Sequence, residues 1–266
     1  MSILERSQWV DPTIDLLVHD VIEYDMKDGG LSIIKEEGLL PPEEIARMDR
    51  LRKGIDRNKA IGKLRYNEKY KDVPKRQNEF FRKYRLLFGE ANELEDDDIL
   101  AVRKDAIFTK KYCYALDFGK HIHFAEKNVY QVYAVLLFNG GAGLKTRYEF
   151  YWKEDGTIDV KGLEDLVVER YHKNCTISVI SQVLRRVYRL DYPGAIKYLC
   201  GFLSKYKRRE LDYDFYRSFD PLSQFPVNFY GTERMFSEMG PELVPMMDIS
   251  YNYTRVWIPL LNLLSS

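Results

Sequence analysis

Two aspartates stand where a pair of carboxylates could do chemistry. Asp25 follows a strand-like segment rich in Ile, Leu and Val at residues 14–24, and Asp105 lies between short apolar runs at residues 99–102 and 106–109. Aspartate is depleted from strand interiors, so an aspartate at a strand end has a cost that a function could explain. Neighbouring strands would let the two carboxylates share Mg²⁺ or Mn²⁺, which accept a few carboxylate oxygens together with substrate phosphates. The alternative interpretation is that each aspartate is a turn or cap residue.

Paired carboxylates of this kind are typical of phosphoryl transfer. Divalent cations held by them can activate an attacking hydroxyl and stabilise the leaving oxygen of an in-line displacement. A nucleotidyltransferase and a metal-dependent nuclease could both use Asp25 and Asp105, and Lys104 stands beside the second aspartate in either case. The two aspartates alone therefore leave both reaction classes open.

The distribution of charge favours a polyanionic partner more than the total charge does. The whole chain has a formal net charge of zero, but residues 52–85 contain thirteen lysines and arginines against four acids, a local charge of +9. A phosphate backbone could lie on such a segment, because lysine and arginine would displace its counterions. The alternative is that the segment forms solvated helix faces.

The order of expected elements favours an α+β fold. Strand-like runs occur at residues 14–24, 99–109, 122–124, 129–138 and 147–152. Helical patterns lie between the first two of these runs and again from residue 163 onward. Pro41 and Pro42 followed by acids predict a helix start there, and Pro74 separates this helical stretch from a second helix. Helices should therefore pack on an antiparallel sheet, with a mainly helical C-terminal part.

Four segments in this order resemble the palm domain of template-dependent DNA polymerases, family B of viral and phage type. Residues 21–30 (VIEYDMKDGG) resemble motif A, and residues 99–108 (ILAVRKDAIF) resemble the motif C hairpin. Residues 124–130 (FAEKNVY) resemble the lysine-and-tyrosine segment, and residues 159–163 (DVKGL) the lysine-glycine motif that follows it. The resemblance covers about residues 14–165.

The resemblance implies a role for each matching residue. Asp25 and Asp105 would be the metal-binding catalytic pair. Lys127, Tyr130 and Lys161 would contact the primer–template backbone. In the helical stretch, residues 57–62 (RNKAIG) match the nucleotide-binding helix only imprecisely, so Arg57, Lys59 and Lys63 are the candidates for the incoming triphosphate.

The chain also departs from the family pattern. Arg103 stands where motif C commonly has a first aspartate, and it could neutralise the site. Gly29 and Gly30 stand where motif A commonly has a bulky aromatic that clashes with a ribose hydroxyl. If that space is free, ribonucleotides should be accepted nearly as well as deoxyribonucleotides. Such departures keep open a palm that binds nucleic acid without synthesis.

Other patterns are weaker. His121 and His123 are two apart on an expected strand and could share a metal, but a structural pair is the simpler interpretation. Residues 140–143 (GGAG) lack the Gly-Lys-Ser/Thr ending of a phosphate-binding loop and predict a hairpin loop. Neither an apolar run of about 20 residues nor a signal-peptide pattern is present, so we expect a cytoplasmic protein without a membrane partner.

The sequence thus predicts a palm-like core at residues 1–165, with a basic, fingers-like helical insertion at about 40–95, and a mainly helical region at 166–266. The expected function is nucleotidyl transfer of polymerase type, which adds nucleotides to a DNA or RNA end. Nucleic acid and nucleoside triphosphates are the expected partners, and further replication proteins could join them. The alternatives are a non-catalytic phage-type binding protein that retains the palm, or a nuclease.

Overall fold

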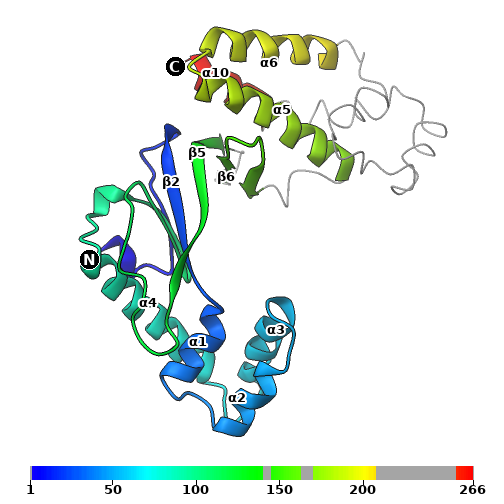
Figure 1. Ribbon diagram of the computed structural model, residues 1–266. Coiled ribbons are helices and arrows are strands. Elements are labelled where there is room, and N and C mark those ends of the chain that lie inside the picture. Colours follow the sequence, from blue (N-terminus) through cyan, green and yellow to red (C-terminus); the bar gives the residue numbers. More distant parts are fainter. Residues whose placement is uncertain (1, 140–144, 163–169, 208–255, 266) are drawn as a thin grey trace, which may run out of the picture. The chain divides into compact units, whose positions relative to one another are not determined.

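The computed structural model of the chain has a seven-stranded sheet and helices at both ends of the sequence (Figure 1). It describes residues 2–139, 145–162, 170–207 and 256–265. The strand order is β1-β3-β4-β2-β5-β6-β7, and the paired strands run antiparallel. The predicted α+β class and antiparallel sheet are therefore confirmed, while the correspondence to a polymerase palm stays a prediction.

The chain divides into two compact units. The first comprises residues 1–12 and 20–129, and the second comprises residues 13–19 and 130–266. This division differs from the predicted boundary at residue 165. The reason lies in the hydrophobic core of the second unit, where side chains of the last strands, such as Trp152, pack with side chains of the C-terminal helices, such as Trp257.

The first unit contains the strands that carry both aspartates. Its strands are β1 (Gln8–Val10), β3 (Ile99–Arg103), β4 (Ala106–Thr109), and parts of β2 (Leu16–Met26) and β5 (Phe124–Asn139). Three short 3-10 helices, η1 (Ile3–Glu5), η2 (Leu64–Tyr66) and η3 (Asp96–Asp98), accompany them. β3 and β4 form the hairpin that the apolar runs predicted, and β4 pairs with β2.

Four helices complete the first unit: α1 (Gly29–Glu36), α2 (Pro42–Asp49), α3 (Ile55–Lys63) and α4 (Val73–Ala91). Both proline signals are confirmed, since Pro42 and Pro74 stand in the first turns of α2 and α4, where a missing backbone N–H has no cost. On α4, Phe81 and Phe88 are buried at helical spacing in the core beside the sheet. α1 contacts α2, α3 and α4, so these helices surround the segment that follows Asp25.

The second unit packs helices on its own strands. It contains β6 (Lys145–Trp152), β7 (Ile158–Lys161), α5 (Arg170–Tyr188), α6 (Tyr192–Lys207) and α10 (Ile258–Ser265). α6 contacts both α5 and α10 (Figure 1). Pro259 lies at the start of α10, and the prolines predicted to mark a loop-rich stretch lie outside the described residues. Among the described helices, none is both long and apolar enough to cross a membrane.

One strand is longer than its sequence suggested. Two separate runs, at residues 122–124 and 129–138, were expected, whereas β5 is continuous from Phe124 to Asn139. The charged and polar residues Lys127 and Asn128 interrupt its apolar pattern, but both donate hydrogen bonds to Glu23 on β2. Side-chain pairing with a neighbouring strand can therefore keep polar residues within a strand that a hydrophobic pattern would end.

Candidate functional site

Asp25 and Asp105 lie at the same end of two neighbouring antiparallel strands. Asp25 on β2 is the direct partner of Ala106, the first residue of β4, and Asp105 immediately precedes it. The backbone N–H of Met26 donates to the Asp105 carbonyl at 3.3 Å. Asp25 thus lies near the end of β2, and Asp105 lies in the turn that immediately precedes its partner strand β4 in the same sheet.

The turn that carries Asp105 is stabilised by a buried arginine. Arg103 and Ala106 are paired, so Lys104 and Asp105 form a two-residue hairpin turn, with Lys104 in the left-handed region at φ 52°. Arg85 on α4 donates hydrogen bonds to the carbonyls of Lys104, Leu4 and Arg6. It is only 1% exposed, and burial lowers its pKa to about 10 although the nearby Asp105 carboxylate opposes this shift.

Arg85 was missed as a positioning residue by the sequence analysis, which counted it among the cations of the basic segment. A sequence signal did exist, because Arg85 follows Phe81 and precedes Phe88 on the apolar face of the helix. A cation on a buried helix face needs several acceptors, and here three carbonyl groups satisfy it.

Asp105 faces a close neighbour on α1. A Cβ atom added at Gly29 would lie 2.7 Å from Oδ2 of Asp105 and 3.1 Å from the ring of Phe81. Burial raises the pKa of the Asp105 carboxyl above its usual range, and the negative charge of Asp25 raises it further. Its own backbone hydrogen bond and the charges of Lys104 and Lys127 act in the opposite direction. The Asp105 carboxylate thus occupies a space that exists because residue 29 has no side chain.

Close packing limits the space beside both glycines of this segment. At Gly30, an added Cβ would lie 3.0 Å from Cδ1 of Ile61 and 3.3 Å from Nε2 of Gln77. The Gln77 amide also donates to the Gly30 carbonyl at 2.6 Å. The expectation that these glycines leave a hydroxyl-sized free volume is therefore corrected, because α3, α4 and Asp105 fill the space beside them.

A lysine joins the carboxylates of β2. Lys127 on β5 donates from Nζ to Oδ2 of Asp25 at 2.9 Å and to Oε1 of Glu23 at 3.1 Å. Asn128 donates to the second oxygen of Glu23 at 2.6 Å. Burial lowers the pKa of the Lys127 ammonium, but its hydrogen bonds to Asp25 and Glu23 outweigh this and leave that pKa above its ordinary value. Lys127 is thus brought to the aspartates, and Glu23 is a participant that the sequence analysis did not single out.

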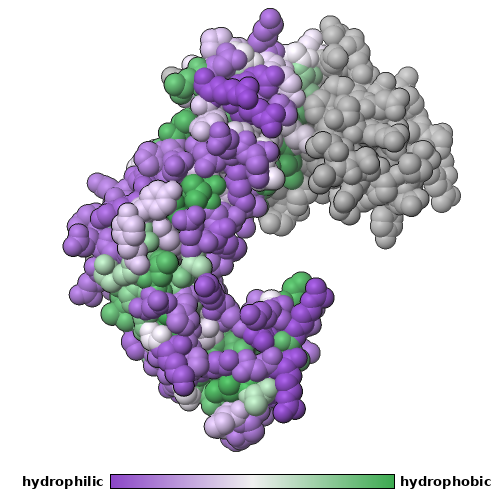
Figure 2. Space-filling model, viewed as in Figure 1, coloured by the Kyte–Doolittle hydropathy of each residue, from purple (hydrophilic) through white to green (hydrophobic). Residues whose placement is uncertain are grey.

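The three triphosphate candidates occupy different environments. Arg57 is buried at 7% exposure, forms an ion pair with Asp28 and donates to the carbonyls of Asp49 and Leu51. Its guanidinium therefore fixes the start of α1 and is already engaged, which corrects its expected availability to a phosphate. Lys59 and Lys63 are exposed and four residues apart on α3, where the visible surface is mainly hydrophilic (Figure 2).

Tyr130 and Lys161 belong to the second unit, whereas Lys127 belongs to the first. Tyr130 is 1% exposed, and its hydroxyl donates to Asp159. In this structure Tyr130 is therefore not accessible to a nucleic-acid backbone, which corrects its expected contact. Lys161 is exposed at the end of β7.

The histidine pair and the glycine-rich segment were the weaker candidates of the sequence. His123 pairs through Nδ1 with Asp117 at 2.5 Å, and in the described part of the chain no group of three or more His, Cys, Asp or Glu side chains is arranged to hold a metal. The glycine-rich segment at residues 140–143 lies outside the described residues.

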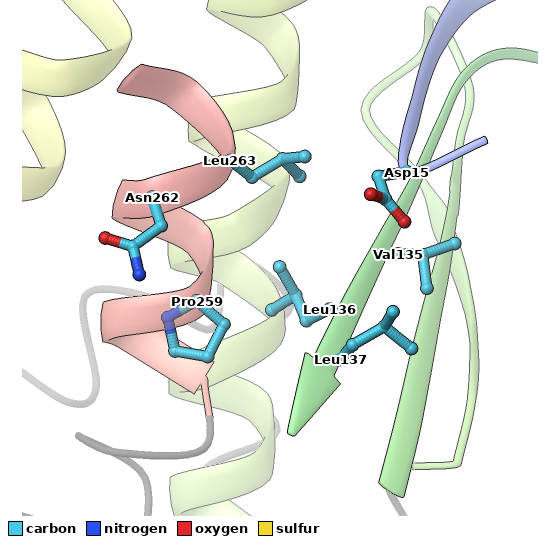
Figure 3. Close-up of a pocket in the computed structure, with 7 residues that line it drawn as sticks. All are labelled: Asp15, Val135, Leu136, Leu137, Pro259, Asn262 and Leu263. Atoms are coloured by element: carbon cyan, nitrogen blue, oxygen red, sulfur yellow. The ribbon is translucent and has the colours of Figure 1, made fainter. Parts of the chain in front are cut away.

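A cavity of about 300 Å³ in the second unit is shown in Figure 3. Its lining is mainly apolar, with Asp15 and Asn262 as polar members, and includes none of the predicted site residues.

The chain matches a known protein family. A family model described as bacteriophage PBS1 gene 130 protein matches residues 2–226. A search of curated proteins finds no match. The family description names a phage gene product and no activity, which agrees with the phage-type character expected from the sequence and leaves the reaction open. Since the match covers well over half of the chain, the protein belongs to the bacteriophage PBS1 gene 130 protein family.

Proposed function

We propose that this protein is a nucleotidyltransferase of nucleic-acid polymerase type, which adds nucleotides to a DNA or RNA end. The observation that supports it is the placement of Asp25 and Asp105 at one end of the paired strands β2 and β4. The raised pKa of Asp105 supports their proximity, because part of the shift comes from the charge of Asp25. Carboxyl groups with a shifted pKa that act on one another are typical of functional sites.

The donor set fits Mg²⁺ or Mn²⁺. Two carboxylates suit such an ion when substrate phosphates and water supply the other ligands, and the absence of a side chain at Gly29 leaves room for the Asp105 carboxylate. Asp25 and Asp105 would hold the ion, which when bound would neutralise phosphate charge and lower the pKa of a nucleophilic hydroxyl. Arg85 keeps the Asp105 turn in place through its carbonyl contacts.

Other residues of the first unit would bind substrate. Lys59 and Lys63 present two ammonium groups on one face of α3, and exposed lysines can bind the phosphates of a triphosphate or of a template. The ion pair between Arg57 and Asp28 joins α3 to the beginning of α1. It would keep those lysines at a constant position relative to the segment that follows Asp25.

The test is incorporation of labelled nucleotides into a primed template, with Mg²⁺ or Mn²⁺ present. We expect Asp25→Asn and Asp105→Asn each to reduce incorporation by about 100-fold or more, since each would lose a charge that acts in the transition state. Asp97→Asn, at an exposed position in η3, is the matched control and should retain full activity. Degradation of labelled DNA without incorporation would instead show a nuclease.

A second candidate function is nucleic-acid binding without catalysis. The hydrogen bond from Lys127 to Asp25 favours it, because an ammonium group already neutralises one of the two carboxylates. Arg103 adds a further cation on β3 beside the same turn. Binding of nucleic acid that persists in Asp25→Asn, together with no incorporation by the unaltered protein at any Mn²⁺ concentration, would favour this candidate.

A further inference from the structure

Lys127 contacts Asp25 and therefore affects how a cation would reach the Asp25 carboxylate. Its Nζ lies between two carboxylates on the same strand, 2.9 Å from Asp25 and 3.1 Å from Glu23. The two acids are two residues apart on β2, and side chains with this spacing point to the same side of a strand. An ammonium group therefore already occupies one coordinating oxygen of Asp25.

The two carboxylates that Lys127 contacts differ in burial. The side chain of Glu23 is 8% exposed and that of Asp25 is 28% exposed, while Lys127 is 52% exposed. Asn128 also donates to Glu23 and so fixes its orientation. Glu23 is therefore a fixed anchor for the ammonium, and Asp25 is its more accessible partner.

We propose that Lys127 is an internal competitor for the divalent cation, which holds Asp25 in the metal-free protein and moves fully onto Glu23 when a cation binds. This inference rests on the proposed function of Asp25 and Asp105 as cation ligands. A divalent cation and an ammonium group repel each other at contact distance, so both cannot be held by the same Asp25 oxygen. The buried Glu23 gives the displaced lysine a partner and avoids leaving its own charge unpaired.

This arrangement would make cation binding depend on substrate. Two carboxylates should bind a free cation weakly when a lysine competes for one of them. A triphosphate that brings its own cation would add phosphate oxygens as further ligands. The competitor would therefore keep the site from holding a cation until a nucleotide delivers one. A simple metal titration of variants can detect this effect without any catalytic assay.

The experiment is Mn²⁺ binding to the full-length protein, followed by electron paramagnetic resonance of free Mn²⁺. We expect Lys127→Gln to bind Mn²⁺ about 10-fold more tightly than the unaltered protein, since groups that contact metal ligands commonly change affinity by about 10–100-fold. Lys127→Arg keeps a cation and should restore weak binding. The matched control Lys53→Gln removes the same charge from an exposed position before α3 and should leave the affinity unchanged.

A second measurement uses the unaltered protein and does not depend on the folding of a variant. Acetylation of lysines with a water-soluble ester is quantified by mass spectrometry with and without Mn²⁺. If Mn²⁺ displaces Lys127 from Asp25, the labelling of Lys127 should increase at least threefold. The labelling of Lys53 should stay constant.

The outcomes separate this inference from the proposed function. Mn²⁺ binding that is lost in Asp25→Asn or Asp105→Asn but unchanged or weaker in Lys127→Gln would overturn the role of Lys127 alone. Constant labelling of Lys127 on Mn²⁺ binding would do the same. No Mn²⁺ binding to the unaltered protein or to Lys127→Gln would overturn both the inference and the metal-dependent function.

Discussion

Two groups of acidic side chains, one in each unit of this molecule, are held differently. In the second unit, Glu149 accepts a hydrogen bond from the Tyr151 hydroxyl at 2.8 Å and lies 3.4 Å from Nε of Arg147. Arg147 in turn donates to the Tyr133 hydroxyl at 2.8 Å. In this tyrosine–glutamate cluster, each carboxylate oxygen of Glu149 has a separate hydroxyl or guanidinium neighbour.

The aspartate pair of the first unit is arranged less favourably. Asp25 and Asp105 raise each other's electrostatic energy, and a single lysine is shared between Asp25 and Glu23. A stable fold commonly pairs its buried charges fully, whereas functional sites retain like charges close together at a cost in stability. This difference indicates a structural role for the tyrosine–glutamate cluster and supports the function proposed for the aspartate pair.

The largest effect is expected from breaking the tyrosine–glutamate cluster. Glu149→Ala would remove the acceptor of the buried Tyr151 hydroxyl and the ion pair with Arg147, and the free energy of unfolding should fall by about 3 kcal/mol. Urea denaturation measures this change. Glu154→Ala, at an exposed turn of the same unit, is the control and should change stability by less than about 0.5 kcal/mol. A loss below about 1 kcal/mol for Glu149→Ala would contradict a structural role for the cluster.

A smaller effect is expected where α1 meets the aspartate pair. Gly29→Ala would place a Cβ 2.7 Å from Oδ2 of Asp105, and overpacking of this kind should cost about 1–2 kcal/mol. In an Asp105→Ala background the same change should cost clearly less, because the oxygen it meets is absent. A double-mutant cycle in urea measures the difference, and equal costs in both backgrounds would show that the Asp105 side chain is not the obstacle.

Removal of the Asp105 charge from the aspartate pair should stabilise the folded protein. The fold raises the pKa of Asp105, so the folded state favours its protonated form, and stability is lost as the pH rises from the unfolded pKa through the folded one. Asp105→Asn removes this penalty and should stabilise the protein by about 1 kcal/mol at pH 7. The gain should disappear below about pH 4. Thermal unfolding at several pH values measures it, and a variant that is less stable at pH 7 would contradict the unfavourable arrangement of the pair.

The smallest effect on stability is expected on α3. Lys59→Ala combined with Lys63→Ala should change the unfolding free energy by less than about 0.5 kcal/mol, because both side chains are exposed. If they contact phosphates, the slope of log affinity for duplex DNA against log salt should become shallower by about 1.8, or 0.9 for each lysine. Lys197→Ala, at an exposed position on α6 outside the basic segment, is the matched control. An unchanged slope would show that these two lysines are solvated and do not contact phosphates.

Local elements of this protein followed from its sequence because they depend on nearby residues. Two apolar runs around Lys104 and Asp105 were sufficient to predict the β3–β4 hairpin, since strand propensity and a short turn are local properties. Prolines and acids at residues 41–44 likewise predicted the start of α2. The proximity of Asp25 and Asp105 was expected through the resemblance to a polymerase palm, and strand pairing was needed to show it.

Tertiary structure alone decided what each charged residue contacts. Arg57 and Arg85 belong to the same basic segment as Lys59, yet both arginines are buried on backbone carbonyls while the lysine is exposed. Composition cannot separate them, because the distinction depends on which carbonyl groups lie within reach after the helices pack. The contact of Lys127 with Asp25 and Glu23 likewise joins residues about one hundred positions apart, and only the pairing of distant strands brings them within hydrogen-bonding distance.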